Sequence, residues 1–116
     1  MGDGLTKIKE DPASSAVYDE LLRCLDGFAE YDVEVKGASV HITHGRAFLG
    51  VHPRKAGLLV NVVTTSAIES DRLKKTERVS ANRYHNEIVL HSTDELDDEV
   101  ASWLRTAYSL TRRASS

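Results

Sequence analysis

Residues 38–63 read ASVHITHGRAFLGVHPRKAGLLVNVV, and this stretch decides the fold. It contains three runs suited to β-strands, at residues 38–44, 47–52 and 58–63. The first two runs are joined by His44-Gly45-Arg46, where glycine readily takes the positive φ of a tight turn. The second and third are joined by residues 53–57, and we expect Pro53 to end the preceding strand because proline cannot donate to a ladder. Strands with such short connections pair antiparallel, so this stretch predicts a β-meander.

Two further strands are expected outside the meander. Residues 33–36 alternate apolar and polar side chains ahead of it. Residues 86–91 form the last predicted strand, with Ile88 and Leu90 on one face. The intervening residues 64–83 are polar, and we expect at most a helical turn there, at residues 66–75.

Amphipathic helices are predicted on both sides of the strands. Asp11-Pro12 combines an N-cap residue with proline at the first helical position, and apolar residues then recur at three- and four-residue steps. The C-terminal helix has the stronger pattern, with acidic residues early and arginines late, as the helix dipole favours. Its apolar stripe comprises Leu96, Val100, Trp103, Leu104, Ala107, Tyr108 and Thr111.

The order of these elements predicts an α+β fold, with an antiparallel sheet of about five strands and the N-terminal and C-terminal helices packed on one face. The opposite face is then open and carries His41, Thr43 and residues around Arg46 and His85. We expect residues 1–10 to be a flexible arm, residues 11–112 to form a single domain and residues 113–116 to be a disordered tail.

Composition narrows the class of protein. The chain has 116 residues, of which 41% are hydrophobic and 28% charged, as in one globular domain. The single cysteine, Cys24, cannot form an internal disulfide, so we expect a reducing, cytoplasmic location. No apolar run is long enough to span a membrane, and the N-terminus lacks the pattern of a secretory signal. The five histidines lack the spacing of a metal site, and no motif indicates a cofactor.

Two segments carry a family resemblance. One is GRAF at residues 45–48 leading to PRKAGL at 53–58; the other is RYHNEIVL at 83–90 leading to Trp103-Leu104 and Ala107-Tyr108. In their order and spacing they resemble a bacterial domain family of unknown function, often catalogued as "predicted transport protein", over roughly residues 12 to 112. More distantly, the layout is similar to the YjbR/MmcQ group, a resemblance that implies a compact α+β unit and DNA binding. Neither resemblance supplies catalytic residues.

Basic side chains next to the strands form the candidate ligand-binding site. Arginine and lysine on loops commonly hold phosphate or carboxylate groups. Because side chains alternate between the two faces of a strand, Arg83, His85 and Glu87 lie on the face of the last strand that points away from its apolar residues. The candidate residues are Arg46, Arg54, Lys55, Arg83, His85 and Glu87. The alternative is that these are solvated surface charges and cross-strand ion pairs.

The leading hypothesis is a non-catalytic binding module that engages a small anionic ligand or a protein partner through the basic loops and the open sheet face. One alternative is a small enzyme that uses His85 as its acid or base, assisted by Glu87 and an arginine. Another is a weak DNA-binding domain, which the net charge of -3 disfavours. A monomer and a homodimer are both compatible with an open sheet.

Overall fold

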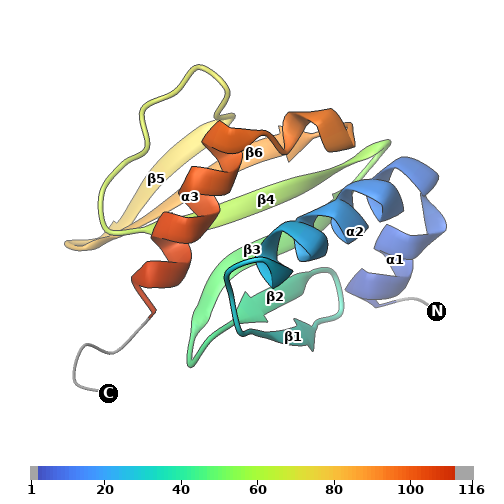
Figure 1. Cartoon of the computed structure of the whole chain (residues 1–116), viewed down its shortest axis with the longest axis horizontal. Helices are drawn as coiled ribbons and strands as arrows, with labels where there is room; N and C mark the ends of the chain where they lie inside the picture. Colours follow the sequence, from blue (N-terminus) through green and yellow to red (C-terminus); the bar gives the residue numbers. More distant parts are fainter. Residues whose placement is uncertain (1–2, 112–116) are drawn as a thin grey trace.

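A computed structural model describes residues 3–111 of the chain. Three helices lie on one face of a single antiparallel sheet (Figure 1). In chain order the elements are α1 (Gly4–Glu10), α2 (Pro12–Asp26), β1 (Asp32–Val35), β2 (Val40–Thr43), β3 (Ala47–Arg54), β4 (Gly57–Thr64), β5 (Lys75–Ser80), β6 (Arg83–Leu90), the short 3₁₀ helix η1 (Thr93–Glu95) and α3 (Asp98–Ser109). No helix within residues 3–111 is long and apolar enough to cross a membrane.

The sheet confirms the α+β prediction and has six strands, in the order β1-β2-β3-β4-β6-β5. The additional strand is β5, which lies in the segment where the sequence indicated only a polar connection. All six of its residues are exposed, so no apolar pattern marks it, and its backbone pairing with β6 holds it in place. Within residues 66–75, where at most a helical turn was expected, the structure has a single turn at Asp71 and Arg72, closed by a hydrogen bond from the Leu73 amide to the Ser70 carbonyl oxygen; the rest of residues 65–74 is an irregular loop. The last strand also begins earlier than predicted, at Arg83.

Pro53 does not end its strand. It lies inside β3, opposite Leu58 of β4, and the turn that follows has only two residues, Lys55 and Ala56. Pairing between β2 and β3 reaches no further than Val51, so the position of the proline has no neighbouring strand on its β2 side. Proline is tolerated there because no ladder hydrogen bond requires its missing N–H.

The flexible arm predicted for residues 1–10 is wrong over residues 4–10, which form α1. Asp3 caps this helix by accepting a 2.8 Å hydrogen bond from the Thr6 amide. Ile8 is completely buried, and a Cβ on Gly4 would lie 2.3 Å from the carbonyl oxygen of Ser39. The helix is thus docked through buried Ile8, partly buried Leu5 and one close backbone approach, a signal too sparse to recognise in sequence. The tail predicted at residues 113–116 lies outside the described residues.

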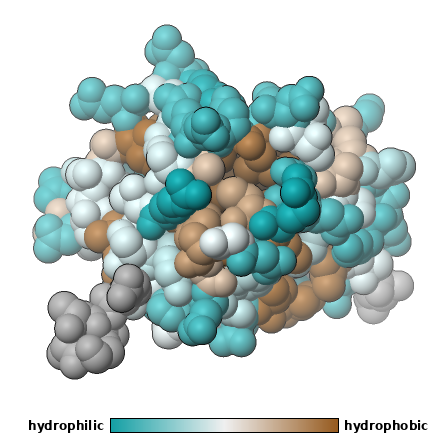
Figure 2. All heavy atoms as spheres, viewed as in Figure 1, coloured by the Kyte–Doolittle hydropathy of each residue, from teal (hydrophilic) through white to brown (hydrophobic). Residues whose placement is uncertain are grey.

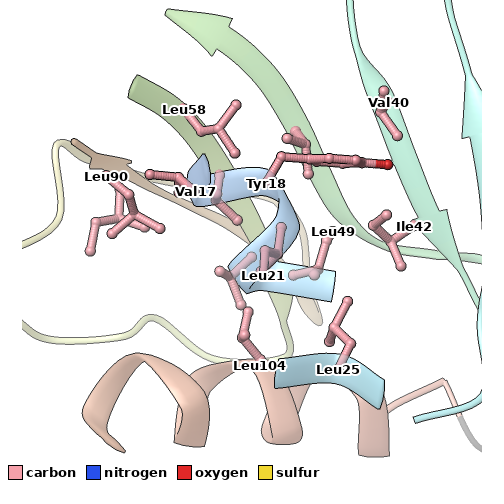
Figure 3. Packing of buried hydrophobic residues seen from close by; sticks show 14 of the residues in the cluster. Val17, Tyr18, Leu21, Leu25, Val40, Ile42, Leu49, Leu58, Leu90 and Leu104 are labelled. Carbon is pink, nitrogen blue, oxygen red and sulfur yellow. The ribbon is translucent and has the colours of Figure 1, made fainter. Parts of the chain in front are cut away.

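The core lies between the helices and the sheet. Figure 3 shows α2 directing Val17, Leu21 and Leu25 toward aliphatic side chains of the sheet, with Leu104 of α3 beside them. On the helix-covered side, hydrophobic residues are visible over the middle of the molecule and hydrophilic residues surround them (Figure 2). Asp11 begins α2 as predicted, by accepting hydrogen bonds from the Ala13 and Ser14 amides. The opposite sheet face has no helix of residues 3–111 packed on it.

Candidate functional site

The open face of the sheet carries a row of polar side chains that crosses all six strands. Strand register places His41 opposite Gly50, Gly50 opposite Asn61, and Asn61 opposite Glu87. Directly opposed residues of paired strands point to the same side of a sheet. His41 therefore lies on the open face, as the sequence predicted, and the row has a gap where Gly50 contributes no side chain.

A shallow pocket of about 100 Å³ has Gly50 in its lining, and we call it the Gly50 pocket. A Cβ added to Gly50 would lie 3.6 Å from Nε2 of His52 and 3.6 Å from Cβ of Asn61, so both side chains lie close to the glycine. His41, Arg83 and His85 complete the polar part of the lining. The pocket is thus lined by polar groups around the backbone of Gly50, namely three imidazoles, one amide and one guanidinium.

A β-bulge shapes one side of the pocket. The register between β2 and β3 shifts between Ile42 and Thr43, so Thr43 is paired with Ala47. The extra residue, Phe48, is 1% exposed and packs edge-on against the ring of Tyr108 in α3. Because a bulge changes which side chains face each side of the sheet, the small side chain of Ala47 is left to line the pocket.

Two buried polar atoms of the pocket make no hydrogen bond to residues 3–111. They are Oδ1 of Asn61 and Nε2 of His85. Both residues line the Gly50 pocket, and they come from the adjacent strands β4 and β6. A buried polar atom without a partner costs about 1–3 kcal/mol, so polar groups of this kind often mark a binding site.

Partial burial favours the neutral form of two of the imidazoles. Desolvation lowers the pKa of His52, and Arg54 and His41 lower it further, against the opposing charge of Glu87. Desolvation also lowers the pKa of His85, helped by Arg83 and opposed by Glu77 and Glu87. A neutral imidazole carries one donor nitrogen and one acceptor nitrogen, so these rings can offer hydrogen bonds of either kind.

Comparison with protein-family models gives a match to a domain of unknown function, DUF5655, over residues 5–111. The chain belongs to the DUF5655 family. No curated protein and no solved structure matches it. The comparisons add no support for the predicted-transport label or for the likeness to the YjbR/MmcQ group.

The fold of this DUF5655 domain brings some of the predicted site residues together at the pocket and places the others away from it. Arg83 and His85 line the pocket, and Glu87 follows on the same face of β6. Arg54 lies beyond His52 at the end of β3, close enough to lower the pKa of that histidine.

The other two predicted residues lie at opposite ends of β3. Arg46 donates a 3.0 Å hydrogen bond from Nη2 to the carbonyl oxygen of Leu110, at the end of α3. Lys55 is exposed in the two-residue turn between β3 and β4. Neither side chain lines the pocket.

Sequence reasoning did not include His52, Asn61 or Gly50 in the site. One local signal was present, because Asn61 interrupts the apolar run of residues 58–63 within β4. His52 and Gly50 alternate with Val51 and so share a face, but their approach to Asn61 depends on strand register. Within the described part of the chain, no group of three or more histidine, cysteine or acidic side chains is placed to hold a metal ion.

Proposed function

We propose that this DUF5655 domain is a non-catalytic binding module that holds an anionic group of its ligand or partner in the Gly50 pocket. The observation that supports this most is the convergence of Arg83 with three imidazoles around a glycine floor on the open face. A guanidinium supplies a fixed positive charge and several donors, and imidazole rings supply further donors.

The size of the pocket limits what it can accept. A pocket with a volume of about 100 Å³ accommodates a group of a few heavy atoms. That is the size of one carboxylate or one tetrahedral oxyanion. The remainder of a larger ligand would lie across the sheet face, over side chains such as Glu87 and Val63.

The lining favours binding over catalysis. Among the described residues, those that line the pocket carry no hydroxyl, thiol or carboxylate side chain that could act as a nucleophile or pair with a base. Oδ1 of Asn61 would gain a partner from a ligand that carries a hydroxyl or amide donor beside its anionic group.

NMR titration of the isotope-labelled domain with sodium sulfate and sodium acetate at pH 6 tests the proposal. We expect chemical-shift changes concentrated at Arg83, His85, His52 and Gly50. Arg83→Gln should weaken binding by at least about ten-fold, because the fixed charge is lost.

A matched pair of glycine substitutions tests the location. Gly50→Ala adds a Cβ that makes only ordinary contacts, so the domain should remain folded. The methyl group would occupy space in the pocket, and the affinity for the anion should fall about ten-fold. Gly37→Ala adds a Cβ with no atom within 4 Å and should change neither folding nor affinity. Shifts that follow Arg46 and Lys55 and ignore Gly50 would place the binding surface elsewhere.

His85 supports a second candidate, an enzyme in which this residue is the acid or base. Its ring lines a pocket, its pKa is lowered, and Glu87 lies on the same strand face. An imidazole that is neutral at pH 7 can accept a proton from a bound substrate. Turnover of a ligand that His85→Gln abolishes with little change in its Kd would establish this candidate in place of the first.

A further inference from the structure

The net charge of the Gly50 pocket depends on its histidines. Arg83 is the only permanently charged side chain in the described lining, whereas His52 and His85 can each be neutral or positive. With His41, these imidazoles come from three strands, β2, β3 and β6, and all face the same hollow.

The charges just outside the lining nearly balance. On the β5–β6 side, Glu77 is opposite His85 and Lys75 is opposite Glu87, with 3.7 Å between the ammonium of Lys75 and the carboxylate of Glu77.

On the β1–β3 side, Glu34 is opposite His41 and is paired with Lys36 at 3.3 Å, and Arg54 follows His52 on β3. Asp32 lies two residues before Glu34 on the same face of β1, opposite Thr43. Four carboxylates and three cations therefore surround the lining, counting Asp32, Glu34, Glu77, Glu87, Lys36, Lys75 and Arg54. Protonation of an imidazole is the remaining means of making the pocket more positive.

Binding of an oxyanion and protonation of the pocket histidines favour each other. Burial opposes a positive charge on His52 and His85 in the free protein. An anion held beside the rings offsets that cost. In protonated His85 both ring nitrogens are donors, so Nε2, which is buried without a partner among residues 3–111, can then donate to an oxyanion whichever tautomer the neutral ring adopts.

We propose that binding of an oxyanion in the Gly50 pocket is coupled to protonation of His52 and His85, so that the site holds its ligand more tightly as the pH falls. This inference rests on the proposed function and adds its regulation. By thermodynamic reciprocity, the bound oxyanion must in turn raise the pKa of the histidines that it contacts.

Sulfate is a suitable probe because its charge does not change between pH 5.5 and 8. We expect the Kd of sulfate, measured by NMR titration, to fall as the pH is lowered across this range. The fall should reach at most about ten-fold per pH unit for each proton taken up. Long-range proton–nitrogen spectra of the imidazoles should show His52 and His85 titrating at higher pH in saturating sulfate than without it.

Matched histidine variants identify the groups responsible. His52→Gln and His85→Gln should each flatten the pH dependence of the Kd. His91→Gln should not, because that ring lies at the far end of β6, where its Nδ1 is 3.1 Å from the carbonyl oxygen of Ala56. Circular dichroism at each pH verifies that every variant is folded.

The outcomes separate the inference from the function on which it rests. Sulfate-induced shifts at the pocket with a Kd that is constant from pH 8 to 5.5 would overturn the coupling and leave the binding module standing. No shift at the pocket at any pH would overturn both.

Discussion

At the scale of single residues, two asparagines on neighbouring strands have opposite roles. Asn86 is completely buried, and its Oδ1 accepts hydrogen bonds from the Ile68 amide and the Thr76 hydroxyl. Its Nδ2 donates to the Val62 carbonyl at 2.9 Å and to the Thr64 hydroxyl at 2.8 Å. Asn86 thus ties β4, β5 and the loop of residues 65–74 to β6.

Replacement of these asparagines by leucine should separate the two roles. Asn86→Leu should lower the free energy of unfolding by about 2–4 kcal/mol, because several buried polar groups lose their partner together. Asn61→Leu on the open face should cost less than about 1 kcal/mol, since Oδ1 of Asn61 has no partner to lose among residues 3–111. Urea denaturation measures both values, and equal costs would contradict this division.

At the scale of elements, α1 shows how a helix can be invisible in sequence and still be part of the core. Its seven residues are mostly polar, and only Gly4 and Ile8 are buried. It packs on α2 and β3, and its first amide donates a 2.8 Å hydrogen bond to the Lys36 carbonyl oxygen. Tertiary contact, more than intrinsic propensity, stabilises a helix this short.

Truncation of its one buried side chain tests this view. Ile8→Ala should destabilise the domain by about 2–5 kcal/mol, the usual cost of deleting a large aliphatic side chain from a core. Lys7→Ala, one position earlier on the exposed side of the same helix, should change stability by less than about 0.5 kcal/mol. Thermal unfolding measures the stability of both variants. An Ile8→Ala protein as stable as the wild type would mean that α1 is not docked.

At the scale of the whole molecule, the half-buried histidines His52 and His85 link stability to pH. The folded-state pKa of His52 and of His85 lies below the ordinary value of 6.5. As the pH falls through 6.5, the unfolded chain takes up protons that the folded protein still resists. Stability should therefore decrease until the folded protein is protonated as well.

Urea denaturation at pH 7.5, 6.5 and 5.5 checks this sign. The free energy of unfolding should fall over this range, and His52→Gln should make the fall shallower. The carboxylates of Asp3, Asp11 and Asp97, whose pKa values are lowered mainly by hydrogen bonds, lose their stabilising effect only at pH values below about 3.8. A decline between pH 7.5 and 5.5 that persists unchanged in His52→Gln and His85→Gln would contradict the assignment.

Strong local patterns made much of the fold predictable. Alternation in β2 and β6, the Asp11-Pro12 start of α2 and the apolar stripe of α3 each concern side chains a few residues apart. The same alternation correctly placed His41 and His85 on the open face. Segments that lack a local pattern were not predicted, because α1 and β5 are held by contacts with distant parts of the chain.

The Gly50 pocket could not be predicted from the sequence, because its lining residues come from different strands. Local pattern was sufficient for the fold class, the helix start and the face of each strand, since propensity and periodicity act within one element. The meeting of His41, Gly50 and Asn61 depends instead on how β2, β3 and β4 are aligned, and a shift of one residue would turn these side chains to the other face. Burial of His52 and His85, which lowers their pKa, likewise exists only after β2, β3, β4 and β6 have come together around the glycine.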